Sequence, residues 1–183
     1  MHKTDQRATI WTIGHSTHSL ETFLEMLHSC KIDLLVDVRN FPGSAKFPHF
    51  NKDHLEKAMP SNGIEYLHMK ALGGRRKPAQ DSVNTRWRND SFRAYADYTQ
   101  TDDFKEALQE LERLASLKRI AYMCSEAVWW RCHRSIISDK LKIQGWEVLH
   151  IMGIGKTSKH PFTSAARIED GKLFYSDKNL FDQ

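Results

Sequence analysis

The feature that most constrains the fold of this chain is a regular alternation of short apolar runs with amphipathic segments of helical spacing. Runs typical of β-strands occupy residues 9–13, 33–39, 64–69, 119–126 and 147–152. Segments typical of helices lie between and after them, at residues 20–27, 51–59, 91–98, 102–117 and 132–143. Such alternation requires crossover connections, which make neighbouring strands parallel and place helices on both faces of the sheet.

We therefore predict a single α/β domain over residues 1–183, with a mainly parallel sheet of about five strands and helices on both faces. A chain of 183 residues can build one substantial core, but it is too short for two ordinary domains. The sequence Glu169-Asp170-Gly171-Lys172 is typical of a tight turn, and it predicts a small C-terminal hairpin between residues 166–168 and 173–175.

The three cysteines, Cys30, Cys124 and Cys132, are an odd number in a chain whose polar first residues predict no signal peptide. Reduced thiols are therefore expected, and with them a cytoplasmic protein. No apolar run approaches the roughly 20 residues that span a bilayer, so we expect no membrane partner. The sequence leaves the oligomeric state open.

A formal net charge of +4 allows an anionic partner, either a small molecule or a nucleic acid. Much of the positive charge lies in a loop-like stretch of about twenty residues, residues 70–89, that has no clear periodicity. Loops of that length inside a compact domain are usually functional or mobile. The basic residues in and beside it are Lys70, Arg75, Arg76, Lys77, Arg86, Arg88 and Arg93.

Polar side chains gather where four of the predicted strands end. The clusters are Gly14-His15-Ser16-Thr17, Asp37 with Arg39, Gly73-Gly74-Arg75-Arg76, and Cys124-Ser125-Glu126 followed by Cys132-His133-Arg134. Ligands of open parallel sheets bind beyond the carboxyl ends of the strands. The clusters therefore predict one common site at that edge.

The combined pattern resembles the family called domain of unknown function 488. The resemblance rests on Thr12-Ile13-Gly14-His15-Ser16-Thr17, Val36-Asp37-Val38-Arg39, Leu72-Gly73-Gly74-Arg75, Tyr95-Ala96-Asp97-Tyr98 and Cys124-x-Glu126 with Cys132-His133-Arg134, and it extends to His150-Ile151 and His160-Pro161. Val128-Trp129-Trp130 departs from the family's usual polar or turn-forming residues at that point. The family name implies no reaction, so the chemistry has to come from the side chains.

Our leading hypothesis is an enzyme, a hydrolase or transferase, that acts on a phosphate-bearing substrate such as a nucleotide or nucleic acid. Asp37 and Glu126 would divide acid and base roles, because carboxylates in unlike environments can differ in pKa. His15, His133 and Cys132 complete the predicted catalytic set. The predicted substrate-binding residues are Ser16, Arg39, Gly73, Gly74, Arg75, Arg76, Cys124 and Arg134. The structural alternative for Asp37, which lies beside Arg39, is an ion pair or a cap on a neighbouring loop.

Two other functions stay open. One is a non-catalytic nucleic-acid-binding module that uses the basic stretch to contact phosphates. The other is a cysteine- or zinc-dependent enzyme, with Cys132 as a nucleophile beside His133 or with zinc held by Cys124, Cys132 and His133 together with Glu126 or His15. Their spacing matches no standard zinc pattern. No cofactor is predicted firmly, because glycine-rich nucleotide-binding spacings are absent.

A second pattern consists of Val36-Asp37-Val38-Arg39, a later strand that ends in Tyr122-Met123-Cys124, and Arg134-Ser135 after it. This pattern resembles rhodanese and cysteine phosphatase domains. Those domains need an arginine about six residues after the cysteine, in a tight loop whose amides surround an oxyanion. Here Trp130 stands at that position, Arg131 lies one residue beyond, and the loop from Cys124 to Arg131 contains no glycine. A tryptophan cannot replace a guanidinium, so we rank this alternative below the others.

Overall fold

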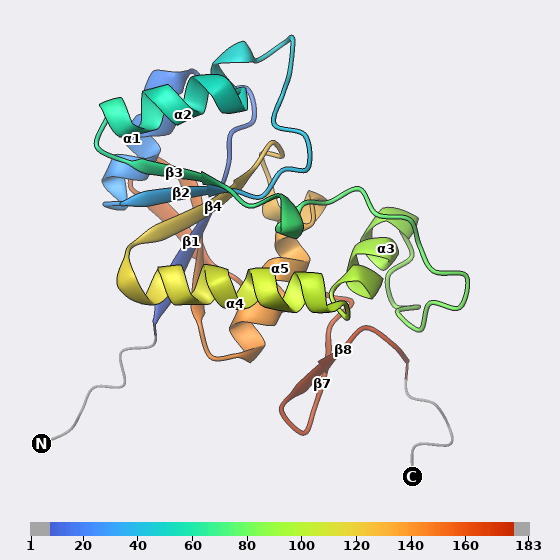
Figure 1. Cartoon of the computed structure of the whole chain (residues 1–183). Helices are drawn as coiled ribbons and strands as arrows, with labels where there is room; N and C mark the ends of the chain where they lie inside the picture. The colour runs from blue at the N-terminus through green and yellow to red at the C-terminus, as the bar shows by residue number, and fades with distance from the viewer. Residues whose placement is uncertain (1–7, 178–183) are drawn as a thin grey trace, which may run out of the picture.

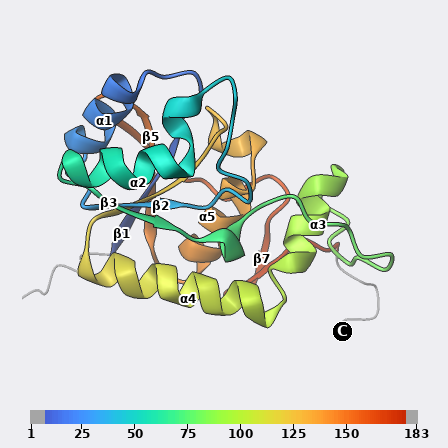
Figure 2. The ribbon, with the colours of Figure 1, turned by 45° about the horizontal axis from the view of Figure 1, so that its top comes forward.

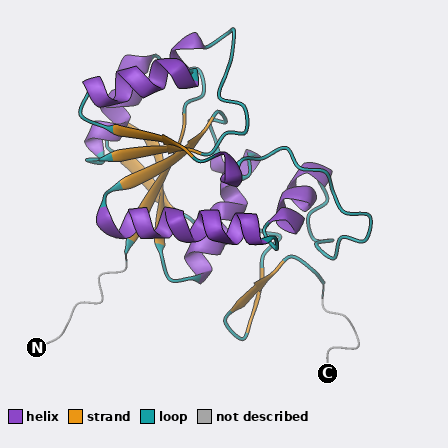
Figure 3. Ribbon diagram, viewed as in Figure 1, coloured by secondary structure: helices purple, strands orange, loops and turns teal. Residues whose placement is uncertain are grey.

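The computed structural model describes residues 8–177, which form a six-stranded sheet between two layers of helices (Figures 1 and 3). The strand order is β3-β2-β4-β1-β5-β6, and every neighbouring pair is parallel except β5–β6. A separate antiparallel hairpin, β7–β8, follows near the C-terminus. The predicted α/β class, the mainly parallel sheet and the hairpin are confirmed.

The strands are β1 (Thr9–Gly14), β2 (Leu34–Asp37), β3 (Glu65–His68), β4 (Ile120–Cys124), β5 (Glu147–Gly153), β6 (Lys156–Lys159), β7 (Arg167–Glu169) and β8 (Lys172–Phe174). The α-helices are α1 (Leu20–Ser29), α2 (Lys52–Ser61), α3 (Asp90–Tyr98), α4 (Asp102–Leu117) and α5 (Arg134–Ile143). Three short 3₁₀ turns are η1 (Pro48–Phe50), η2 (Lys70–Leu72) and η3 (Trp129–Arg131).

The helices divide between the two faces of the sheet. Figure 2 shows α1 and α2 above the sheet and α4 below it, and α5 packs into the same core as α4. Alternate residues of a strand point to opposite faces. On β1, Ile10 therefore packs with the α4 and α5 core, whereas Trp11 and Ile13 pack with the α1 and α2 core.

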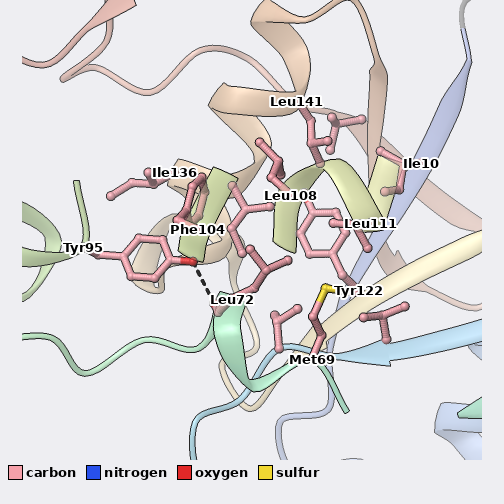
Figure 4. Packing of buried hydrophobic residues seen from close by; sticks show 14 of the residues in the cluster. Ile10, Met69, Leu72, Tyr95, Phe104, Leu108, Leu111, Tyr122, Ile136 and Leu141 are labelled. Atoms are coloured by element: carbon pink, nitrogen blue, oxygen red, sulfur yellow. Dashed lines mark hydrogen bonds between the residues drawn. The ribbon is translucent and has the colours of Figure 1, made fainter. Parts of the chain in front are cut away.

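The α4 and α5 core explains why the long segment before β4 folds as it does. Phe104, Leu108 and Leu111 form the apolar stripe of α4 and are almost completely buried. The hydroxyl of Thr101 caps the helix by accepting a hydrogen bond from the Phe104 amide. Figure 4 shows Tyr95 of α3 reaching this cluster, with its hydroxyl donating to the Leu72 carbonyl at 2.7 Å.

Two elements differ from the sequence expectation. Residues 156–159, all polar and exposed, form β6 at the edge of the sheet, where a strand pairs on one side only and needs no apolar side chains. The last α-helix begins at Arg134 instead of residue 132, because the Cys132 backbone is extended. Among residues 8–177, no helix has the length and apolar character needed to cross a membrane.

The order of the strands creates a switch point between β1 and β4. The chain leaves β1 through α1 on one face of the sheet, and it leaves β4 through α5 on the opposite face. The ends of the two strands stay paired, because His15 N donates to the Cys124 carbonyl and Ser16 N to the Ser125 carbonyl, both at 3.0 Å. Such a point opens a crevice at the carboxyl edge of a sheet.

Gly14 ends β1 at this crevice, and no larger residue fits there. A Cβ atom at position 14 would lie 1.7 Å from the Glu126 carbonyl oxygen and 2.9 Å from Nη2 of Arg134. Both are parts of the loop and helix that follow β4. The glycine therefore lets these segments close onto β1.

We predict that Gly14→Ala lowers the free energy of unfolding by at least about 2 kcal/mol, because the methyl group must displace backbone. Urea unfolding followed by circular dichroism measures this change. Gly43→Ala is the matched control, since a Cβ there meets no atom within 4 Å, and its effect should stay within about 0.5 kcal/mol. Equal stabilities of the two variants would contradict this account of Gly14.

Candidate active site

A cavity of about 590 Å³ lies at the predicted edge, beyond the carboxyl ends of β1, β2 and β4. Its lining residues are His15, Ser16, Thr17, Arg39, Asn40, Phe41, Gly43, Ser44, Phe47, Gly74, Arg75, Cys124, Ser125, Glu126, Ala127, Cys132 and His133. A larger hollow of about 810 Å³ lies at the opposite edge, but there the Arg119 side chain is held by the Cys30 and Lys31 carbonyls. Seven of the titratable residues predicted from the sequence line the first cavity, whereas Asp37, Arg76 and Arg134 do not; the seven are His15, Arg39, Arg75, Cys124, Glu126, Cys132 and His133.

Two cysteines form the floor of this cavity. Cys124 ends β4 and Cys132 precedes α5, and their sulfur atoms lie 3.2 Å apart. Nε of Arg134 donates to both sulfurs, at 3.0 Å to Cys124 and 3.3 Å to Cys132. A buried cation in contact with both sulfurs favours a negative charge on one of them.

The two thiols divide this charge unequally. Burial alone would raise the pKa of Cys132, but the hydrogen bond from Cys124 and the charge of Arg134 outweigh burial and lower this pKa to about 5. Burial, together with the bond to Cys132 and its charge, raises the pKa of Cys124 well above the ordinary value. At neutral pH the pair is therefore a Cys132 thiolate that accepts a hydrogen bond from the Cys124 thiol.

Arg134 lies beneath the cysteines and not on the cavity wall. It is only 2 % exposed, its Nη1 donates to the Thr12 hydroxyl at 2.8 Å, and its Nη2 donates to the Glu126 carbonyl at 2.7 Å. From the sequence, Arg134 is predicted to bind the substrate. The structure instead places its Nε against the two sulfurs, where its charge stabilises a thiolate, and Arg134 is not among the residues that line the cavity.

A buried chain of hydrogen bonds continues from Arg134 through Thr12 to two histidines. Thr12 Oγ1 lies 3.4 Å from Nδ1 of His150, and Nε2 of His150 lies 2.9 Å from Nδ1 of His160. Nε2 of His160 lies 2.9 Å from Oδ1 of Asp139 on α5. All four residues are buried, so we refer to Thr12, His150, His160 and Asp139 as the relay.

One direction of donation along the relay pairs each of its four side chains. The Thr12 hydroxyl donates to His150, His150 donates to His160, and His160 donates to the Asp139 carboxylate. Burial, with smaller contributions from His160 and Arg134, lowers the pKa of His150 to about 2, so this ring is neutral. The Trp129 ring stacks on His150 at 4.6 Å and encloses the relay, whereas Trp130 is 53 % exposed.

His133 stands on the cavity wall beside Cys132 and is half-buried. Its Nε2 donates to the Val38 carbonyl at 2.8 Å, which fixes the tautomer and leaves Nδ1 as an acceptor. Burial lowers the pKa of His133, so the ring is neutral near pH 7. Nδ1 faces Gly74, where a Cβ atom would come within 3.1 Å of it.

Asp37 lies outside the cavity and is completely buried in an ion pair with Arg39. Its carboxylate accepts hydrogen bonds from Nε and Nη2 of Arg39, from the Arg39 amide and from the Tyr66 hydroxyl. The structural alternative weighed for Asp37 therefore fits this geometry, and the predicted acid or base role has no open oxygen to use. The ion pair holds Arg39 against the cavity.

The His15 side chain is also held by hydrogen bonds, one to each of its ring nitrogens. Its Nδ1 donates to the Ser16 carbonyl at 2.9 Å, and its Nε2 accepts from Nη1 of Arg39 at 3.3 Å. The ring stacks on Phe50 at 4.3 Å, and burial lowers its pKa to about 4. His15 therefore orients Arg39 as a neutral side chain, and it has no nitrogen free for proton transfer.

The remaining predicted residues divide between the cavity and its support. Glu126 and Arg75 are exposed on the wall, and Ser16, also on the wall, has a left-handed backbone with φ of 46°. Gly73 is buried against the backbone of Asn40. Arg76 lies outside the cavity, with its guanidinium 3.6 Å from the centre of the Tyr98 ring.

The donor set does not fit a zinc ion. Within residues 8–177, no group of three or more His, Cys, Asp and Glu side chains is arranged to hold a metal. At the Cys124–Cys132 pair, Arg134 already occupies the position of the counter-cation.

Comparison with known proteins gives one match. A model of the family described as Domain of unknown function DUF488 matches residues 19–141. No curated protein and no solved structure matches the chain. The matched residues include both cysteines of the cavity, whereas Thr12, His150 and His160 of the relay lie outside them.

We predict that iodoacetamide alkylates Cys132 with a pH midpoint near 5, and that Thr12→Val raises this midpoint by roughly one pH unit. Valine keeps the shape of threonine but removes the acceptor that orients Arg134, so the thiolate is less stabilised. Mass spectrometry of the alkylated peptide measures the rate at each pH. Thr12→Ser retains the hydroxyl and should keep the midpoint; a Thr12→Val midpoint equal to that of the parent would exclude a role for the relay.

Proposed function

The chain belongs to the family described as Domain of unknown function DUF488, a description that names no reaction, and from the geometry we propose that it is an enzyme that attacks anionic substrates with the Cys132 thiolate. One observation carries the proposal. The Arg134 guanidinium contacts both sulfurs from beneath, while Cys132 borders an open cavity. Such a thiolate is ionised at neutral pH and reachable from solvent, which are the two requirements for a cysteine nucleophile.

His133 is the proton carrier in this proposal. The Cys132 sulfur forms a bond to the electrophilic atom of the substrate as the bond to the leaving group breaks. Nδ1 of His133 then takes a proton from a water molecule whose oxygen bonds to the same atom as the bond to sulfur breaks. The second product leaves, the Cys132 thiolate is restored, and the proton on Nδ1 passes to solvent. Support comes from the fixed tautomer, the lowered pKa and the direct proximity in sequence to Cys132.

Two arginines would hold the anionic part of the substrate. Arg39 has five N–H groups, and contacts with Asp37, Phe50 and His15 use four of them, which leaves one on Nη1. Arg75 adds an exposed guanidinium on the same wall. A phosphate or carboxylate group fits this pair of donors.

This proposal favours the cysteine-dependent alternative over carboxylate chemistry. Asp37 is fully engaged with Arg39 and Tyr66, so Glu126 is the one carboxylate of the original pair that borders the cavity.

A small phosphate-bearing molecule suits the site better than a long nucleic acid. Arg86, from the basic stretch, is used to hold the Ala165 carbonyl and Asp177. Reduced thiols are consistent with the proposed cytoplasmic location.

We predict that Cys132→Ser lowers turnover at least about 1000-fold, because a hydroxyl next to Arg134 remains protonated and is a weak nucleophile. The assay uses a panel of nucleotides and small phosphate esters. Cys30→Ser is the control, since Cys30 lies in the α1 and α2 core and should leave turnover unchanged. Full activity of Cys132→Ser on every substrate found would disprove the proposed mechanism.

We predict that inorganic phosphate protects Cys132 from iodoacetamide, and that Arg75→Ala raises the half-protecting phosphate concentration about tenfold. The variant removes one of the two cationic donors of the cavity wall. Arg76→Ala is the matched control, because that guanidinium packs on Tyr98 outside the cavity. If both variants show the same protection as the parent, Arg75 does not bind the anion.

A further inference from the structure

The proposed reaction uses Cys132 and leaves Cys124 without a chemical role. Resting on the proposed function of Cys132, we propose that Cys124 and Cys132 are a reversible redox pair, in which a small hydroperoxide oxidises Cys132 and Cys124 closes a disulfide that switches the nucleophile off. This inference adds an oxidisable site and a form of regulation to the cavity.

The geometry of the pair carries the proposal. The sulfur atoms lie 3.2 Å apart, so about 1 Å of approach would form a bond of about 2.05 Å. Cys132 lies between η3 and α5, at an extended residue outside regular helix. Both cysteines line the cavity, which gives a small oxidant access to the Cys132 sulfur.

The chemistry is balanced by the two thiols and one peroxide. The Cys132 thiolate attacks one peroxide oxygen, the O–O bond breaks, and the alkoxide or hydroxide that leaves takes up a proton. The resulting Cys132 sulfenic acid is attacked by the sulfur of Cys124, which gives up its proton as water departs. Overall, the peroxide is reduced by two electrons and the cysteines are oxidised to a disulfide.

Arg134 determines how easily this disulfide is reduced. Within residues 8–177, no carboxylate contacts the Arg134 guanidinium, whose neighbours are the two sulfurs, a hydroxyl and a carbonyl. Oxidation removes the thiolate and leaves a buried cation without a counter-charge, which is costly. The reduced form is therefore favoured, and we expect thiols such as glutathione to reopen the disulfide.

The test oxidises the full chain with a slight excess of hydrogen peroxide and maps the cysteines by mass spectrometry. We expect a Cys124–Cys132 disulfide peptide, at least about tenfold faster modification of Cys132 than of Cys30, and full recovery of free thiols in reduced glutathione. Cys30→Ser should behave as the parent. In Cys124→Ser and Cys124→Ala, Cys132 should proceed instead to sulfinic and sulfonic acids.

Three results would overturn the proposal: sulfinic acid at Cys132 of the parent protein with Cys124 still free, first oxidation at Cys30, or a disulfide that resists glutathione. The readout is independent of turnover, so the two proposals fail separately. If Cys132→Ser stays active while the parent forms the disulfide, the nucleophile role falls and the redox pair stands. If Cys132→Ser is inactive and no disulfide forms, the reverse holds.

Discussion

The buried guanidinium of Arg134 is the interaction on which this site depends. A cation that is 2 % exposed would be strongly destabilising without partners, and removing one partner of a buried charge pair typically costs about 3–5 kcal/mol. Here the partners come from different parts of the chain: the two cysteines, Thr12 on β1 and the Glu126 carbonyl. A single side chain on α5 thus joins β1, β4 and the loop between β4 and α5. The close approach at Gly14 follows from this convergence, because the Glu126 carbonyl has to reach both β1 and Arg134.

Because alternate residues of a strand point to opposite faces of the sheet, the hydrogen-bond networks of Arg39 and Arg134 lie on opposite faces and do not join. On β2, Val36 faces the α4 and α5 core and Leu35 faces the α1 and α2 core, so Asp37 shares the side of Leu35. Asp37, Arg39 and His15 consequently assemble against Phe50 on that side. Thr12 and Arg134 assemble on the other. The cavity lies at the carboxyl edge of the sheet, where the two networks come within reach of one ligand.

The sequence was sufficient to predict the class of the fold and the edge of the sheet at which polar residues gather. Alternating patterns identify parallel strands, and parallel strands bring distant segments to one rim. The sequence did not predict which polar groups pair with one another, because this pairing depends on the order of the strands and on how deeply each side chain is buried. Asp37 and Arg134 were both predicted to face a ligand, yet Asp37 is paired with the buried Arg39 and Arg134 with the buried Cys124. A weak signal for the relay existed, since Asp139 interrupts the apolar face of the last helix, but its partner His160 lies 21 residues away.

Arg134 stabilises the thiolate with its charge, whereas His133 stays neutral, and this difference has a chemical consequence. In a cysteine–histidine pair the imidazole often takes the thiol proton and becomes charged, so it can no longer act as a base. Here the Cys124 hydrogen bond and the charge of Arg134 lower the pKa of Cys132, and burial lowers the pKa of the histidine beside it, so that this ring is neutral near pH 7. Its proton on Nε2 is fixed by the Val38 carbonyl, and Nδ1 remains a lone-pair acceptor next to Gly74. In the mechanism that we propose, the site therefore combines an ionised nucleophile with an unprotonated base at neutral pH, a combination that one histidine could not supply alone.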